Sequence, residues 1–282
     1  MFWILLATIF VTFNPMIDFT LRKYRELLQC LKKKGYKFIT FEQYCEQKAL
    51  GKVDDSRWVI LRHDVDLRAK NSLAVAEIEH ELGIAASYYF RVVKESNQPD
   101  VIQSIVDLGH EIGYHYEDMA MAKGDTEKAF AHFQQQLSYF RGFYPVRTIC
   151  MHGAPTSKWD GKDLWNKYDY HTLGVIGEPY FDIDFSSVFY LTDTGRCWDG
   201  YKVSVRDKIP MYQDEWIKKN WIYHKTDEII QAAEQGTLPN QIMITTHPQR
   251  WTDKRQAWVK EMFTQTIKNI IKRILIKRQH AQ

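Results

Sequence analysis

The tetrapeptide His-Asp-Val-Asp at residues 63–66 lies where a buried strand is expected to end and an amphipathic helix to begin. Side chains two apart on a strand share a face, so Asp64 and Asp66 should point the same way, with Arg62 below them. Two carboxylates this close repel each other unless a cation or a shared proton relieves them. The pattern indicates a metal site or an acid/base pair, and a solvated Asp-rich turn is the alternative.

Four further polar clusters lie at or just after predicted strands. Within Gly109–Asp118, His115 and Glu117 are two apart and should share a face, whereas His110 should point away. A single histidine is more often a core residue than a ligand, but the carboxyl ends of parallel strands converge on one edge, where separate clusters can build one site. The other three clusters are His152-Gly153-Ala154-Pro155, Thr246-His247-Pro248 and the segment 193–199, which reads DTGRCWD with Arg196 between two acids.

Strands and helices alternate along the chain, and this alternation predicts an α/β fold. Helical patterns that end at a glycine lie between most of the strand candidates, which is typical of a distorted (β/α) barrel of seven or eight parallel strands. The clearest helices are 69–82, 100–108, 126–140 and 226–235. The strand candidates are 37–40, 58–61, 86–92, 111–115, 147–151, 172–176, 188–191 and 241–245.

Two later regions have less regular patterns. Residues 177–220 lack clear helical periodicity and are expected to form an elaborated loop over the mouth of the barrel. The last helix, 254–278, is expected to pack on the barrel, although a basic amphipathic helix could also bind a membrane. The stripe predicted to face the barrel comprises Trp258, Met262, Ile270, Ile271 and Ile274.

Composition limits the class of protein. The 282 residues are 45% hydrophobic and 26% charged, which suits one large globular domain. A net charge of +3 without a basic stripe argues against a nucleic-acid partner. The four cysteines show no paired spacing, so a reducing, cytoplasmic compartment is expected. The aromatic fraction of 14% suits a groove that stacks on sugar faces, although aromatic side chains are more often core.

The first fifteen residues differ from the rest of the chain. The run from Phe2 to Phe13 is apolar but shorter than the roughly 20 residues that span a bilayer, and it lacks the basic start of a signal peptide. We therefore expect residues 1–15 to be an apolar leader or a misassigned start, and one domain to cover 16–282. Membrane association through residues 1–15 is the less favoured alternative.

The motifs RHDVD, GHEIGYH, MHGAP and TTHP together resemble those of the polysaccharide deacetylases of carbohydrate esterase family four, the NodB-homology superfamily, in a divergent branch linked to surface-polysaccharide synthesis. The resemblance covers most of the chain from about Met16, and its specific parts are HDVD and GHEIGYH. It implies that Asp64 is the general base, Asp66 and His115 are metal ligands, and His247 is the general acid.

This chain departs from the family at one ligand. The family's second motif is His-x-x-x-His, and its second position is Met119 here, a poor ligand for a hard or borderline ion. His152 is the favoured replacement and Glu117 its rival. The ion would be one divalent metal, zinc first, with Fe, Co, Ni or Mn as alternatives.

The resemblance implies a metal-dependent hydrolase that removes acetyl groups from an N-acetylated sugar or polysaccharide. Arg62 would support the base, and Arg196, Trp198 and Asp199 would contact the substrate. Two alternatives stay open, because a fold does not fix the bond that is cleaved. One is hydrolysis of another non-peptide C–N bond, and the other is a catalytically silent glycan-binding protein of polysaccharide assembly, suggested by Met119.

Overall fold

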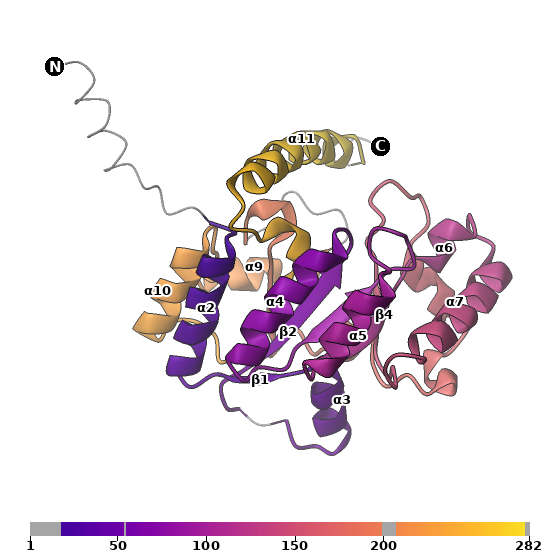
Figure 1. Cartoon of the computed structure of the whole chain (residues 1–282), viewed down its shortest axis with the longest axis horizontal. Coiled ribbons are helices and arrows are strands. Elements are labelled where there is room, and N and C mark those ends of the chain that lie inside the picture. Colours follow the sequence, from indigo (N-terminus) through magenta and orange to yellow (C-terminus); the bar gives the residue numbers. More distant parts are fainter. Residues whose placement is uncertain (1–17, 54, 199–206, 280–282) are drawn as a thin grey trace.

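A computed structural model describes residues 18–53, 55–198 and 207–279, with side chains described up to residue 270. Helices and parallel strands alternate through most of this part of the chain (Figure 1). The strands are β1 (Lys37–Ile39), β2 (Trp58–Val65), β3 (Ser87–Phe90), β4 (Glu111–Tyr116), β5 (Ile149–Met151), β6 (Phe189–Thr192) and β7 (Gln241–Thr246). The α-helices are α2 (Leu21–Lys33), α3 (Phe41–Ala49), α4 (Ala69–Glu81), α5 (Pro99–Asp107), α6 (Asp118–Met121), α7 (Thr126–Phe140), α8 (Pro179–Asp182), α9 (Pro210–Lys218), α10 (Thr226–Gln235) and α11 (Arg255–Gln279).

The strands form one parallel sheet in the order β5-β4-β3-β2-β7-β6. The long strand β2 pairs with β1 along its first half and with β3 along its second half, and β7 lies on its other side. The sheet curls into an open half-barrel, so the predicted α/β fold with seven parallel strands is confirmed. Because every strand runs the same way, the carboxyl ends of β2, β4, β5 and β7 lie along one edge.

Helices α2, α4 and α5 lie side by side over one face of the sheet, and α10 packs on α2 (Figure 1). Helix α2 begins after Thr20, whose side chain accepts the Lys23 N–H at 3.1 Å. The Asp18 carboxylate accepts the backbone N–H of Thr226 at the start of α10, at 2.9 Å. This contact therefore joins the first third of the chain to its last third.

A fully buried polar cluster lies behind β2, on the face opposite Asp64. His63 is 2.7 Å from both the Glu79 carboxylate and the Thr246 hydroxyl, and Glu79 also accepts hydrogen bonds from Tyr24 and Tyr88. Burial raises the pKa of Glu79, but the neighbouring His63 imidazole outweighs it and the net pKa is lowered. The cluster ties α2 and α4 to three strands and fixes the strand end that carries Asp64 and Asp66.

We expect Glu79→Ala to destabilise the fold by about 3 kcal/mol or more, because it leaves buried hydroxyl and imidazole groups without their acceptor. The midpoint of urea unfolding measures the loss. Glu81→Ala is the matched control on the same helix: its exposed pair with Arg25, at 2.6 Å, should contribute less than about 1 kcal/mol. Equal losses in the two variants would contradict a stabilising role for the cluster.

Two sequence predictions about elements were wrong. The expected strand 172–176 is not a strand: Tyr170–Leu173 form a 3-10 helix (η2) that ends at Gly174 with φ 72°, and the segment joins the sheet only through a bridge from Thr148 to Gly177. The region 177–220 is more regular than the expected loop, because it holds α8, β6, the short 3-10 helix η3 (Thr194–Arg196) and α9. Short polar helices lack the long apolar stripe that periodicity detects.

The last helix, α11, matches its predicted length and part of its predicted face. Trp258 and Met262 are partly buried as expected, whereas Ile270 is 54% exposed. Ile271 and Ile274 lie outside the described side chains. No helix in the described part of the chain is both long and apolar enough to cross a bilayer.

Candidate functional site

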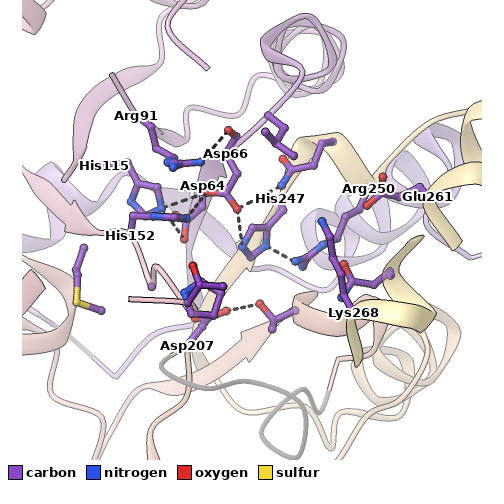
Figure 2. A pocket seen from close by; sticks show the side chains of 18 of the residues that line it. Asp64, Asp66, Arg91, His115, His152, Asp207, His247, Arg250, Glu261 and Lys268 are labelled. Carbon is purple, nitrogen blue, oxygen red and sulfur yellow. Dashed lines mark hydrogen bonds and ion pairs between the residues drawn. The ribbon is translucent and has the colours of Figure 1, made fainter. Parts of the chain in front are cut away.

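The carboxyl edge of the sheet opens into a cavity of about 410 Å³. Five side chains predicted from separate motifs line it together, and Figure 2 shows them pointing toward one another. They come from four strand ends that are distant in sequence: Asp64 and Asp66 from β2, His115 from β4, His152 after β5 and His247 after β7.

Asp64 is buried and held by a bidentate ion pair. The Arg62 guanidinium donates to both carboxylate oxygens, from Nε to Oδ1 at 2.8 Å and from Nη2 to Oδ2 at 2.6 Å. Burial raises the pKa of Asp64, but Arg62 together with His115 and His247 outweighs it, and the net pKa is lowered. Asp64 is therefore an ionised carboxylate in a fixed orientation, with Oδ2 3.7 Å from Nε2 of His115.

Asp66 faces two imidazoles at once. Its Oδ1 atom lies 3.5 Å from Nε2 of His115 and 3.5 Å from Nε2 of His152, and this buried oxygen accepts no hydrogen bond. Its Oδ2 atom accepts a hydrogen bond from Gln249 at 3.4 Å. Burial raises the pKa of Asp66, but the His152 imidazole and its neighbours outweigh it and leave the pKa well below its usual range.

Both imidazoles are oriented by a hydrogen bond on Nδ1, the ring nitrogen that faces away from Asp66. Nδ1 of His115 lies 2.9 Å from the Cys150 carbonyl oxygen, which can only accept, so this nitrogen carries the proton and Nε2 is left with a free lone pair. Nδ1 of His152 lies 2.9 Å from Glu117 in the same way. A lone pair directed into the cavity by a hydrogen bond on the far nitrogen is the usual state of a metal-binding histidine.

Glu117 does not face the cavity as a ligand would. Besides His152, it pairs with Arg91, whose Nη2 lies 2.7 Å from Oε1 and 2.9 Å from Oε2. Burial raises the pKa of Glu117, but hydrogen bonds from His152 and the Arg91 charge outweigh it and set the pKa to about 2. Glu117 is therefore an anion that supports His152 from behind. Arg91, which the sequence reasoning missed, lines the cavity beside it.

His247 belongs to a buried dyad with Asp193. Nδ1 lies 2.6 Å from Asp193 Oδ1, while Nε2 points toward Asp66 Oδ2 at 3.8 Å. Burial and the nearby Arg250 lower the pKa of His247, but Asp193 and Asp66 together outweigh them and the net pKa is raised. Asp193 itself is held by Arg250 and by Trp251, whose indole N–H donates at 2.8 Å. The imidazole can thus carry a proton on the atom that faces the cavity.

A second set of groups at this edge could also hold a metal ion. Asp64, His115 and Cys150 are buried, and each offers one ligand atom within 4.8 Å of the other two. The Cys150 thiol is fully enclosed, and burial raises its pKa well above its usual range. It is therefore a protonated thiol at neutral pH.

Of the three residues predicted to contact substrate, the two that the structure describes, Arg196 and Trp198, do not line this cavity. Trp198 is buried in the core, where its indole N–H donates to the Thr226 hydroxyl at 2.9 Å. Arg196 lies over the rings of Phe19 and Trp258 and lines a separate cavity of about 260 Å³. Asp199 lies outside the described residues. Polar groups that do line the first cavity, and that sequence reasoning did not identify, are Thr156, Tyr180, Asp207, Gln249, Arg250 and, from α11, Glu261, Gln265 and Lys268.

No protein-family model and no curated protein sequence matches this chain. Several solved structures are similar to it. The Streptococcus pyogenes deacetylase PplD, in complex with acetate, is 12% identical over 51% of this chain and 66% of its own, with a TM-score of 0.43. A CE4 family pseudoenzyme from Bacillus anthracis is 14% identical over 76% of this chain and 65% of its own, with a TM-score of 0.38.

A family 4 carbohydrate esterase from Streptomyces lividans, in complex with acetate, is 16% identical over 75% of this chain and 88% of its own, with a TM-score of 0.37. The chain thus spans about two thirds of the first two structures. These structures are a deacetylase, a pseudoenzyme and a carbohydrate esterase, and the similarity concerns the fold alone.

Proposed function

We propose that this protein is a metal-dependent hydrolase that removes the acetyl group from an N-acetylated sugar. One observation carries the proposal: a buried carboxylate oxygen of Asp66, without a hydrogen-bond donor, lies 3.5 Å from the Nε2 atoms of His115 and His152. A buried carboxylate oxygen that accepts no hydrogen bond is costly, and a cation between the three atoms would remove that cost.

The spacing suits a small divalent ion. Ligand atoms about 2.0–2.2 Å from a tetrahedral zinc ion are separated by roughly 3.3–3.6 Å, and the two separations measured from Asp66 are 3.5 Å. Two imidazoles and one carboxylate suit zinc first and also Fe, Co, Ni or Mn. We prefer this set to the one containing Cys150, because that thiol is protonated and both oxygens of Asp64 already accept hydrogen bonds from Arg62.

A divalent ion bound here would supply Lewis acidity, polarising the acyl carbonyl and lowering the pKa of a water molecule. Asp64 would accept the proton of the attacking water, since it is ionised and its Oδ2 faces the same space as His115. Arg62 would keep the carboxylate in that orientation.

His247 would donate a proton to the departing amine, because an amide nitrogen cannot leave as an anion. Asp193 favours the charged imidazole and holds its Nδ1, so the transferable proton sits on Nε2, which faces the cavity. The products would be acetate and a free amino sugar. Support for a sugar comes from the motif resemblance, and a cavity of about 410 Å³ is large enough for a small saccharide.

Metal content and acetate release together test the proposal. Purified protein should hold about one divalent ion per chain and release acetate from N-acetylated sugars, and both should disappear after chelation and return when metal is added. His115→Ala is the control and should lose both. Stoichiometric metal without acetate release would favour hydrolysis of another C–N bond. Absence of both metal and activity would favour the silent glycan-binding protein that Met119 suggests.

The third ligand can be tested separately. We expect His152→Ala to abolish stoichiometric metal binding, because it removes a proposed ligand, whereas Glu117→Ala should weaken binding by about 10-fold to 100-fold, as loss of a residue that orients a ligand usually does. Competition with a chromogenic chelator measures both affinities. Retention of metal by His152→Ala together with its loss in Glu117→Ala would instead favour an Asp66, His115 and Glu117 site.

A further inference from the structure

Helix α11 presents an apolar face away from the domain. Phe263, Ile267 and Ile270 are 61%, 59% and 54% exposed, and at 100° per residue they fall within about 60° of arc. The helix runs along the outside of the molecule, above the remaining elements (Figure 1). A row of large apolar side chains on one face of a helix is the usual mark of a contact surface rather than of chance exposure.

The opposite face of α11, which packs on the domain, is mainly polar. Gln265 is buried, Asn269 donates to the Gly195 carbonyl at 2.8 Å, and Glu261 pairs with Arg68 at 3.1 Å. Trp258, near the start of the helix, donates to the Asp18 carbonyl at 2.7 Å. Specific polar contacts therefore fix the inner face of the helix, whereas the apolar side chains of its outer face have no partner in the described structure.

The charges on α11 indicate what the outer face contacts. Arg255 and Lys260 are exposed on either side of the apolar row, whereas Glu261, the acidic residue of this part of the helix, is buried and paired with Arg68. A cationic border around an apolar row suits the interface of an anionic lipid bilayer. The sequence also contains an apolar run from Phe2 to Phe13, which lies outside the described residues.

We infer that α11 docks the protein on an anionic membrane surface, with Phe263, Ile267 and Ile270 at the level of the acyl chains. The helix would lie in the plane of the interface, and its inner face would still line the cavity through Glu261 and Gln265. A second copy of this chain is a poorer occupant, because it would place the same cations against each other. Three side chains also bury less than the roughly 800 Å² per partner of a stable dimer.

Co-sedimentation of the full chain with vesicles tests this inference. Vesicles of 70% phosphatidylcholine and 30% phosphatidylglycerol should bind the protein, and pure phosphatidylcholine should bind it at least 5-fold more weakly. The triple variant Phe263→Ser, Ile267→Ser, Ile270→Ser should lose binding by 10-fold or more. The double variant Arg255→Gln, Lys260→Gln should bind about 5-fold to 25-fold more weakly at low salt, because each basic residue near an anionic surface contributes about 5-fold in affinity. Each variant should keep the wild-type circular dichroism spectrum, because the substituted side chains are exposed.

Met211→Ser is the matched control, because Met211 is 83% exposed on α9 rather than α11, and its binding should equal that of the wild type. Three results would overturn the inference. One is wild-type protein that does not bind anionic vesicles. The second is a triple variant that binds them normally, which would place the contact elsewhere, for example in residues 1–15. The third is a dimer in solution that the triple variant dissociates, which would identify a second copy as the partner.

Discussion

Asp64→Asn should reduce turnover by at least about 100-fold while leaving one divalent metal ion bound per chain. The amide cannot accept the proton of an attacking water, and a positioned base usually contributes 10²-fold to 10⁴-fold. The bound metal should persist because the proposed ligands are Asp66, His115 and His152. Initial rates of acetate release, with metal content measured on the same preparation, give both quantities.

Asp66→Asn is the control for this expectation. It keeps the shape of the side chain but removes the anionic oxygen that lies 3.5 Å from both imidazoles, so it should lose the metal as well as the activity. The two variants therefore separate a base from a ligand at positions two residues apart. Equal metal loss in both would show that Asp64 also binds the ion, as in the alternative set with His115 and Cys150.

The parts of the site that sequence analysis brought together depend on rules of local geometry. Alternation along a strand placed Asp64 on the face opposite His63, and the structure shows His63 paired with Glu79 on that far face. The parallel sheet then brings His115 and His247 to the same edge, since the carboxyl ends of its strands coincide. Neither inference requires knowledge of the side-chain packing.

The groups that sequence analysis missed depend on tertiary contacts without a local signal. Asp193 is one of the two acids in the candidate segment 193–199, but its role was not predicted, because only the pairing of β6 with β7 places it beside His247. The available clue was that Asp193 comes just after one predicted strand and His247 just after another, so the two could meet if those strands paired. Trp198 illustrates the reverse error: its ring suggested sugar stacking, but the core buries it.

The error on α11 has a different physical origin. Periodicity measures which side chains share a face but not which way that face points, so the apolar stripe was assigned to the domain. The polar residues Asn269 and Glu261, which bond Gly195 and Arg68, fix the helix so that Ile270 faces outward, while Trp258 and Met262 remain partly buried as predicted. Apolar side chains on a surface helix are buried only if something covers them, and in the described structure nothing covers Ile270.

His247→Ala should lower acetate release from an N-acetylated sugar by about 10²-fold or more while leaving metal content unchanged. Its Nε2 lies 3.8 Å from Asp66 Oδ2, which suits a proton donor beside the ligands. On an aryl acetate ester the defect should be much smaller, because a phenolate leaves without being protonated. The ratio of kcat/KM on the two substrates, compared with that of the wild type, therefore isolates proton donation from binding and folding.

Asp193→Asn should reproduce this pattern, since it removes the carboxylate that holds Nδ1 at 2.6 Å and favours the charged imidazole. Because the two residues act as one unit, the double variant should be about as slow as the slower of the two single variants. If His247→Ala were equally slow on ester and amide, or had lost its metal, His247 would be a ligand or a packing residue. The proton donor would then have to be another group at this edge. Among the described residues, Arg91 and Lys268 also line the cavity as cations, besides Arg250, which already holds Asp193.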